Sequence, residues 1–386
     1  MSDALALYIH WPFCVSKCPY CDFNSHVRDS VDQAVWRDAL LADMAHEAAL
    51  TKGRRLGSIF FGGGTPSLMP PDTTSALIAA AQAQWGFTDD VEITLEANPS
   101  SVEAANFAAL AAAGVNRASL GLQALDDATL AFLGRAHKVD ESLKALETAQ
   151  AHFNRVSIDL IYARPDQTPD DWEAELARAI GFGTTHMSLY QLTIEPGTRF
   201  ATDVAKQQWV PLDDDSAADL YELTQHHMAA AGLPAYEISN HAAAEAESRH
   251  NLAYWRYQDY VGIGPGAHGR RLGMATQRHK KPENFITAVA RNGHGLKSED
   301  RLDPATQAME ALLMGLRLRE GVDISALSDR FAIDSADLLD WGAVEKLVGL
   351  GFVHRAMWKI AVTPKGFPLL DAILPQIVAI EPVTAA

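Results

Sequence analysis

Cys14-Val15-Ser16-Lys17-Cys18-Pro19-Tyr20-Cys21 contains all three cysteines of the 386-residue chain. Three cysteines placed at random would share so short a window in about one chain in a thousand, so the cluster indicates a site. The spacing is C-x3-C-x2-C, which lets three thiolates converge within one loop. Thiolate sulfur is a soft ligand that selects zinc or iron–sulfur clusters. The stretch therefore predicts a metal centre.

Two kinds of metal centre remain open. A disulfide framework is not expected, because the number of cysteines is odd and the N-terminus does not resemble a signal peptide. A structural zinc site needs four ligands, and with no second CxxC pair the fourth would have to be His10, Asp22 or His26. A 4Fe-4S cluster normally takes four cysteines, so three would leave one iron open to a substrate or cofactor.

Composition limits the class of protein. A hydrophobic content of 48% and a charged content of 21% are typical of soluble globular chains, and no run of about 20 apolar residues predicts a membrane span. We therefore expect a cytoplasmic protein. The net charge of −17 argues against a broad surface for nucleic acid. One local basic cluster, which we expect to be a solvated loop, consists of Arg270, Arg271, Arg278, Lys280 and Lys281.

The first half of the chain alternates apolar, β-rich runs with amphipathic helical segments. This pattern predicts an α/β fold with a parallel sheet, and six β/α units predict a partial (β/α)6 barrel of the TIM type. The expected strands are 5–10, 58–61, 92–96, 117–122, 155–162 and 186–193. The expected helices between them are 32–52, 72–85, 102–112, 138–152 and 168–180.

Chemically useful residues follow or end these strands. In barrels of this type, functional residues sit at the C-terminal ends of strands, so we expect one shared cleft. Its candidates are the cysteine loop, the run Gly62-Gly63-Gly64-Thr65-Pro66, Glu96, Gln123 and Asp159. The glycine run lacks the lysine of a P-loop, so phosphate binding is a poor interpretation. Consecutive glycines after a buried strand instead let a ligand approach the backbone closely.

The cysteine loop, with Tyr20 before its last cysteine, resembles the signature of the radical S-adenosylmethionine (SAM) superfamily. The resemblance implies that Cys14, Cys18 and Cys21 hold a 4Fe-4S cluster whose open iron binds SAM. In that family, an electron from the cluster cleaves SAM to a 5′-deoxyadenosyl radical. The glycine run resembles the family's glycine motif, which implies that Gly63, Gly64 and Thr65 hold the methionyl amino group of SAM.

Other runs resemble the oxygen-independent coproporphyrinogen oxidase group within that superfamily. They are Leu95-Glu96-Ala97-Asn98-Pro99, Gly121-Leu122-Gln123, Gly134-Arg135-Ala136-His137 and Ser157-Ile158-Asp159-Leu160-Ile161-Tyr162. The resemblance implies that SAM is contacted by Tyr8, Glu96, Gln123, Arg135 and Asp159. Carboxylates can accept from ribose hydroxyls, and a guanidinium can pair with a carboxylate.

The resemblance to the oxidases breaks at Phe23. The oxidases of the group have the cysteine pattern C-x3-C-x2-C-x-C and a longer N-terminal extension. In this chain, Phe23 occupies the position of the further cysteine. The surrounding segment resembles a heme-chaperone branch of the group. This implies a chaperone that binds heme and delivers it to recipients such as respiratory-chain hemoproteins, some of them membrane-associated; a homodimer is compatible with this role. The alternative is an oxidase that decarboxylates coproporphyrinogen III.

A second motif, His250-Asn251-Leu252-Ala253-Tyr254-Trp255, resembles the H-N-x-x-Y-W motif associated with heme in that branch. The resemblance makes His250, Asn251, Tyr254 and Trp255 heme candidates, because imidazole can ligate heme iron and aromatic faces can pack on a porphyrin. From the residues alone, core packing is the other interpretation. Nearby, we expect a short strand at Tyr236–Ser239 and an irregular glycine-rich segment over 262–269. The alternative to a solvated loop for the basic cluster is contact with heme propionates or an acidic partner.

The chain beyond residue 300 is expected to be helical with a small hairpin, in a winged-helix-like arrangement. Residues 301–386 hold 8 Lys and Arg against 11 Asp and Glu, so a surface for a partner or a lid is expected rather than DNA binding. The expected domains are a barrel at 1–235, a β extension with the H-N-x-x-Y-W motif at 236–300, and the C-terminal domain at 301–386.

Overall fold

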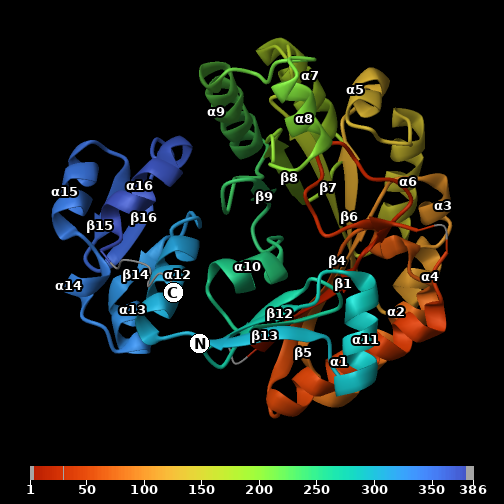
Figure 1. Cartoon of the computed structure of the whole chain (residues 1–386). Coiled ribbons are helices and arrows are strands. Elements are labelled where there is room, and N and C mark those ends of the chain that lie inside the picture. The colour runs from red at the N-terminus through yellow and green to blue at the C-terminus, as the bar shows by residue number, and fades with distance from the viewer. Residues whose placement is uncertain (1–3, 29, 380–386) are drawn as a thin grey trace.

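The computed structural model describes residues 4–28 and 30–379, and its main feature is one 11-stranded sheet (Figure 1). The strand order is β13-β12-β11-β10-β1-β4-β5-β6-β7-β8-β9. A separate three-stranded sheet, β14-β16-β15, belongs to the C-terminal part, and a two-stranded sheet joins β2 (Phe13–Cys14) to β3 (His26–Val27). No helix in the described part of the chain is both long and apolar enough to cross a bilayer.

The six predicted barrel strands are confirmed, and each pairs in parallel with the next. They are β1 (Ala4–Trp11), β4 (Arg55–Gly63), β5 (Phe87–Ala97), β6 (Arg117–Gln123), β7 (Arg155–Tyr162) and β8 (His186–Gln191). Burial explains their composition: a parallel sheet covered on both faces needs continuous apolar runs, and Leu7, Ile9, Ile59, Phe61 and Leu95 are all fully buried.

Helices connect successive strands and lie on the outside of the curved sheet, as the partial barrel requires (Figure 1). They are α1 (Gln33–Leu50), α2 (Pro71–Trp85), α3 (Ser101–Ala104), α4 (Phe107–Ala112), α5 (Asp127–Phe132), α6 (Val139–His152), α7 (Pro169–Ile180), α8 (Arg199–Ala205) and α9 (Asp214–Ala230), with a short 3-10 turn η1 (Pro66–Leu68). The helix expected over 102–112 is broken into α3 and α4 by a turn at Ala105 and Asn106.

The sheet continues past the predicted strands at both edges. On one side, β10 (Tyr260–Ile263) pairs in parallel with β1, followed by antiparallel β11 (His268–Arg271), β12 (Met274–Arg278) and β13 (Leu296–Arg301). On the other, β9 (Asn240–Ala242) pairs antiparallel with β8. Helices α10 (Arg249–Trp255) and α11 (Pro282–Asn292) connect these edge strands.

Two local predictions in this region are wrong. Residues Tyr236–Ser239 form bends, and the strand begins only at Asn240. The glycine-rich segment 262–269 is irregular only in its middle, since its ends belong to β10 and β11. A Cβ at Gly262 would lie 1.9 Å from the carbonyl oxygen of His268, so glycine there permits two strands to approach more closely than any side chain would allow.

The expectation that the basic cluster is a solvated loop is wrong for its three arginines, whereas Lys280 and Lys281 are exposed. Arg271 and Arg278 are buried and pair with Glu47 at 2.5 and 2.6 Å, and Arg278 also reaches Asp43 at 3.3 Å. Arg270 is buried and pairs with Glu310 at 3.4 Å. Burial alone would raise the pKa of Glu47, but the two guanidinium groups hold that pKa below its usual value. These arginines therefore tie β11 and β12 to their neighbours and are not free to meet heme propionates.

Arg278→Met is expected to lower the free energy of unfolding by about 3–5 kcal/mol, because it leaves the carboxylates of Asp43 and Glu47 buried with too little positive charge. Urea unfolding followed by circular dichroism measures the change. Arg291→Met, on the exposed surface of α11, is the matched control and should change stability by less than about 0.5 kcal/mol. Equal effects in the two variants would contradict a role for the buried network.

The C-terminal part has its own core and the winged-helix-like arrangement that was predicted. Its core includes the fully buried side chains Leu312, Ile324, Val344, Ile360 and Ile377. Its elements are α12 (Pro304–Gly315), β14 (Val322–Asp323), α13 (Ile324–Phe331), α14 (Ser335–Leu338), α15 (Trp341–Gly349), β15 (Val353–Ala356), β16 (Lys359–Val362), η2 (Phe367–Leu369) and α16 (Leu370–Ile377).

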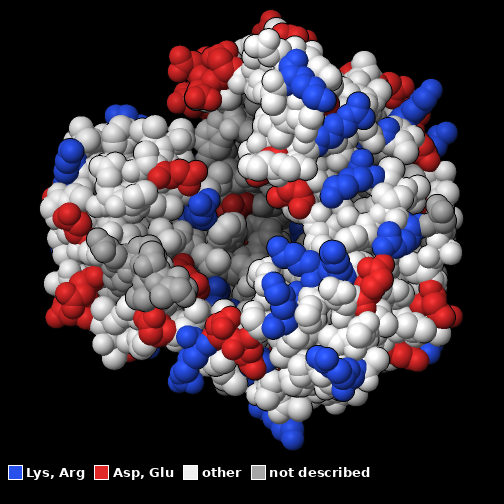
Figure 2. Space-filling model, in the orientation of Figure 1, with Lys and Arg blue, Asp and Glu red and all other residues white. Residues whose placement is uncertain are grey.

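The three-domain division stays a prediction. Residues 236–300 contribute strands to the same sheet as the barrel, and Tyr257 packs into the C-terminal core. The outer ends of the predicted domains, 1–3 and 380–386, lie outside the described residues. Figure 2 shows a hollow near the middle of one face, with lysine and arginine side chains gathered beside it. A negative net charge therefore coexists with local positive surface.

Candidate functional site

A cavity of about 430 Å³ brings together most of the predicted site residues. It opens at the C-terminal ends of β1, β4, β5 and β6. Strand β7 contributes Asp159, which lies in the middle of that strand. Its walls include all three cysteines and every SAM candidate except Tyr8, namely Cys14, Cys18, Cys21, Gly63, Gly64, Thr65, Glu96, Gln123, Arg135 and Asp159. The expectation that strand ends share one cleft is confirmed in geometry. Which ligand these residues contact stays a prediction.

The cysteine loop presents its thiols along one wall of this cavity. All three cysteines are free and half-buried. Cys14 Sγ accepts from Thr65 Oγ1 at 3.4 Å, and Cys18 Sγ accepts from Arg135 Nη1 at 3.4 Å. Burial raises the pKa of the Cys14 and Cys21 thiols. A bound metal would reverse that preference, since a coordinating thiol is deprotonated.

The donor set fits an iron–sulfur cluster. Among the described residues, no three His, Cys, Asp or Glu side chains converge closely enough to hold a single metal ion. A cluster takes one thiolate on each of three irons, so its ligands surround a larger object and need not meet at one point. The three free thiols match this requirement, because they lie on the wall of a cavity that has room beside them.

The glycine run after β4 packs too tightly for side chains. A Cβ at Gly63 would lie 2.6 Å from the ring of His10, and one at Gly64 would lie 2.7 Å from the carbonyl oxygen of Phe13. Gly63 also has φ +114, which residues other than glycine rarely adopt. Its N–H donates to Glu96 Oε2 at 3.3 Å. The run is therefore wedged between β1 and the cysteine loop with its backbone on the cavity wall.

Two buried carboxyl groups, those of Glu96 and Asp159, line the same cavity. Burial and the neighbouring Asp159 raise the pKa of Glu96 to about 8, and burial raises the pKa of Asp159 to about 6. Ser119 Oγ donates to Asp159 Oδ1 at 3.3 Å. At neutral pH, Glu96 is therefore mainly protonated and can donate as well as accept, while Asp159 is mainly an acceptor. The pair offers mixed hydrogen-bonding groups for a polar ligand.

The raised pKa of Glu96 makes stability depend on pH. Its folded pKa lies above its unfolded value, so ionisation costs stability as pH rises from about 4.5 to about 8. Glu96→Gln should remove this cost. Its free energy of unfolding should exceed that of the parent protein by about 1–2 kcal/mol at pH 8 and should differ little from it at pH 5. Urea unfolding of the ligand-free protein at both pH values tests this. The control is Glu222→Gln, at an exposed position, which should show no such difference between the two pH values. An effect of Glu96→Gln that is the same at both pH values would contradict the raised pKa of Glu96.

Arg135 joins the cysteine wall to the opposite one. Its Nη2 donates to Asn98 Oδ1 at 2.5 Å and to the carbonyl oxygen of Gly121 at 3.2 Å, and Asn98 Nδ2 in turn donates to Thr65 Oγ1 at 3.2 Å. Asn98 was not among the predicted contacts, although it directly follows β5 and could have been identified by its place at a strand end. At the end of β6, Gln123 has a left-handed φ of 69, a strained conformation of the kind that clusters at functional sites.

Tyr8 lies outside the main cavity but beside it. Its OH donates to His10 Nδ1 at 2.9 Å, and His10 Nε2 donates to the carbonyl oxygen of Asn24 at 2.9 Å. Burial lowers the pKa of His10 to about 4, so this imidazole is neutral, and both of its nitrogens are engaged. Tyr8 lines two neighbouring spaces instead, of about 220 and 570 Å³. Its predicted contact with SAM therefore has less support than those of the cavity-lining residues.

His250 is enclosed in the barrel interior. It is 1% exposed, its Nδ1 contacts Ser58 Oγ at 3.0 Å, and its Nε2 contacts Tyr254 OH at 2.9 Å. The adjoining cavity, which Asn251 also lines, holds about 220 Å³, below the ~300–1,000 Å³ of common ligand pockets. Trp255 lines neither this cavity nor the main one. In this conformation, His250 has no free nitrogen for heme iron, and it positions Tyr254.

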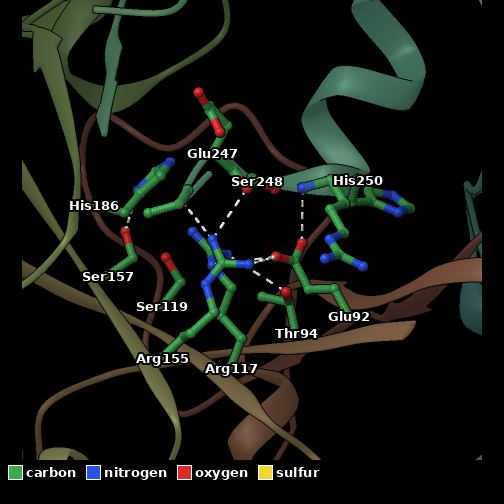
Figure 3. A network of polar contacts seen from close by, with 12 residues as sticks. Glu92, Thr94, Arg117, Ser119, Arg155, Ser157, His186, Glu247, Ser248 and His250 are labelled. Atoms are coloured by element: carbon green, nitrogen blue, oxygen red, sulfur yellow. Dashed lines mark hydrogen bonds and ion pairs between the residues drawn. The ribbon is translucent and has the colours of Figure 1, made fainter. Parts of the chain in front are cut away.

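A buried ionic network holds the helix that carries His250 (Figure 3). Glu92 Oε1 accepts from the backbone N–H of Arg249 at 2.9 Å, and Glu92 Oε2 pairs with Arg155 Nη1 at 2.5 Å. Arg155 also donates to the carbonyl oxygen of Glu247 at 3.0 Å. The network fixes the start of α10 against β5 and β7, so the H-N-x-x-Y-W motif is rigidly placed.

Comparison with known families agrees with this architecture. Residues 8–179 match the model of the Radical SAM superfamily, and residues 302–369 match that of the HemN C-terminal domain. The structure of coproporphyrinogen III oxidase (HemN) from Escherichia coli, described as a radical SAM enzyme, superposes with a TM-score of 0.82 over 97% of this chain and 90% of that one. The two are 23% identical, so the likeness shows the fold alone.

Three relatives resemble the chain over most of its length. "Radical S-adenosyl methionine domain-containing protein 1, mitochondrial" from Mus musculus is 40% identical and covers 97% of this chain and 87% of its own. "Heme chaperone HemW" from Escherichia coli is 38% identical, covering 82% and 83%. The protein of the same name from Bacillus subtilis is 32% identical, covering 93% and 95%.

The barrel, its three-cysteine cavity and these matches define a radical SAM protein with a HemN-type C-terminal domain. Within that class, the chain belongs to the HemW family. Membership of the superfamily implies a 4Fe-4S cluster and SAM, and the free thiols and the adjoining cavity fit both. The zinc alternative is not supported by these matches.

Proposed function

We propose that this protein is a heme chaperone that holds a 4Fe-4S cluster and SAM, binds heme and delivers it to recipient proteins. The observation that carries the proposal is the similarity, over more than four fifths of the chain, to proteins named heme chaperone HemW. Phe23 supports it independently. This side chain is 61% exposed on the wall of the main cavity, at the position where the oxidases are expected to carry a further cysteine.

In this proposal, Cys14, Cys18 and Cys21 hold the cluster. The main cavity receives SAM, with the backbone of Gly63, Gly64 and Thr65 facing its methionyl end. Glu96, Gln123, Arg135 and Asp159 supply polar contacts, and Tyr8 contributes from the side. When bound, the cluster supplies a site of electron transfer next to SAM. The residues of this chain fix the position of that ligand and limit its contact with water.

The recipients are proposed to be hemoproteins of the respiratory chain, including membrane-associated ones. We place the protein in the cytoplasm on the strength of its bacterial relatives, while the Mus musculus relative is named mitochondrial. Reduced thiols suit either compartment. Assembly as a homodimer remains part of the proposal.

The second candidate function is oxygen-independent coproporphyrinogen III oxidation. The fold shared with HemN, with a TM-score of 0.82, favours it. Phe23 argues against it, since this residue stands where the oxidases are expected to carry a further cysteine. The chaperone is therefore the first candidate.

Heme delivery can be tested with membrane vesicles that contain a heme-free respiratory cytochrome. Heme-loaded protein should transfer its heme to the cytochrome faster than the same concentration of free heme, as followed by the absorbance of the reduced cytochrome. Heme bound to serum albumin is the control for simple release. Transfer no faster than from albumin would contradict delivery.

A further inference from the structure

A second cavity, of about 570 Å³, adjoins the main one. It lies between the cysteine loop and the strands β10 and β11. Lys17, Phe23, Gly63 and Glu96 line both cavities, so the two spaces share a wall. Its volume falls within the ~300–1,000 Å³ of ligand pockets, unlike the small space beside His250.

Aromatic side chains form much of this second cavity. Tyr254 and Tyr260 both line it, and their ring centroids lie 4.3 Å apart in an edge-to-face arrangement. Phe23, which is 61% exposed, faces the same space. An exposed phenyl ring costs free energy when it is left in water, so a flat apolar ligand would gain by covering it.

Positive charge stands at two places on the rim. Lys17 and Lys280 both line the cavity and both are exposed. Within residues 4–28 and 30–379, neither ammonium group has an ion-pair partner. The acidic members of the wall are Asp22 and Glu96, and Glu96 is mainly protonated at neutral pH. The rim therefore suits a ligand with more than one carboxylate.

His268 offers a ligating nitrogen in the same cavity. Its side chain is exposed, and its Nε2 accepts from the amide of Gln277 at 3.2 Å. This hydrogen bond occupies the single lone pair of Nε2, so an iron that binds there displaces the Gln277 amide. The two other imidazoles on this wall are more engaged: both nitrogens of His10 are hydrogen-bonded, and His26 Nε2 contacts Asn24 Oδ1 at 3.3 Å.

We propose that this second cavity is the heme subsite, with His268 Nε2 as the axial ligand, Phe23, Tyr254 and Tyr260 against the macrocycle, and Lys17 and Lys280 paired with the two propionates. The inference rests on the proposed chaperone function and deepens it. The H-N-x-x-Y-W motif then acts through Tyr254, which is a heme contact, and His250 is a positioning residue that fixes its hydroxyl. A single axial ligand at an exposed strand edge also suits a carrier that must release its cargo.

The test is heme titration of the cluster-loaded full-length protein under anaerobic conditions, recorded as difference spectra against the same protein without heme. His268→Ala is expected to shift the Soret maximum and to weaken heme binding about 10-fold or more. His152→Ala, an exposed histidine on α6 remote from the cavity, is the matched control and should behave as the parent. Added imidazole should restore the parent spectrum in His268→Gly, as only a lost axial ligand predicts.

A second matched pair of variants tests the lysines at the rim of the cavity. Lys280→Glu should weaken heme binding several-fold, by about one charge-assisted contact, whereas Lys281→Glu, its exposed neighbour outside the cavity wall, should not. If the parent binds heme but His268→Ala keeps both its Soret maximum and its affinity, the subsite is wrong and the chaperone function stands. If the parent binds no heme, the proposed function fails and the subsite fails with it.

Discussion

Cys18→Ser is expected to abolish the iron–sulfur absorbance of the reconstituted protein. A serine hydroxyl is a hard, neutral donor in place of a soft thiolate, and only three thiolates are present to hold the cluster. Changes to groups that merely support metal ligands cost about 10–100-fold in metal affinity, so loss of a ligand should cost at least that much. Iron content and visible absorbance after anaerobic reconstitution measure the effect.

The control for this variant lies in the same loop. Ser16→Ala alters an exposed residue between two of the cysteines and should leave iron content unchanged. Normal absorbance and iron content in Cys18→Ser would show that the cluster is held elsewhere, and the assignment of all three cysteines would fail.

Gly63→Ala should weaken SAM binding at least 10-fold while leaving the cluster in place. The added methyl group would lie 2.6 Å from the ring of His10 and would force a left-handed residue out of its conformation, which moves the backbone on the cavity wall. Calorimetric titration of the cluster-loaded protein with SAM measures the change. Absorbance of the cluster in the same sample shows whether the cysteine loop is intact.

Gly53→Ala separates the cost of a left-handed backbone from the effect of the close contact with His10. Gly53 also has a left-handed φ, of +83, but a Cβ there would meet no atom within 4 Å, and the residue lies in the turn before β4. Its variant should lose about 1 kcal/mol of stability and bind SAM normally. Unchanged SAM affinity in Gly63→Ala would contradict the proposed position of the ligand.

Much of the barrel could be predicted because its signals are local. Each parallel strand is buried on both faces and therefore forms a continuous apolar run that can be recognised without its neighbours, as in Leu5–His10. The strand-end rule then placed Glu96 and Gln123 on one cavity wall, far apart in sequence, because parallel strands end at the same edge.

The edge strands and the buried arginines could not be predicted in the same way. Arg271 and Arg278 look like surface residues in sequence, and only the return of β11 and β12 onto α1 brings them to Glu47. The role of His250 could not be decided from the sequence for a similar reason. A histidine beside aromatic residues fits heme ligation and core packing equally well, and the choice depends on Ser58, which lies 192 residues earlier in the chain.

The most direct test of the central claim is made on one sample of anaerobically reconstituted protein. That sample is titrated with heme and then assayed for the decarboxylation of coproporphyrinogen III in the presence of SAM and a reductant. A heme chaperone is expected to bind heme stoichiometrically and to show no decarboxylation. Robust turnover of coproporphyrinogen III would contradict it and would establish the protein as an oxidase.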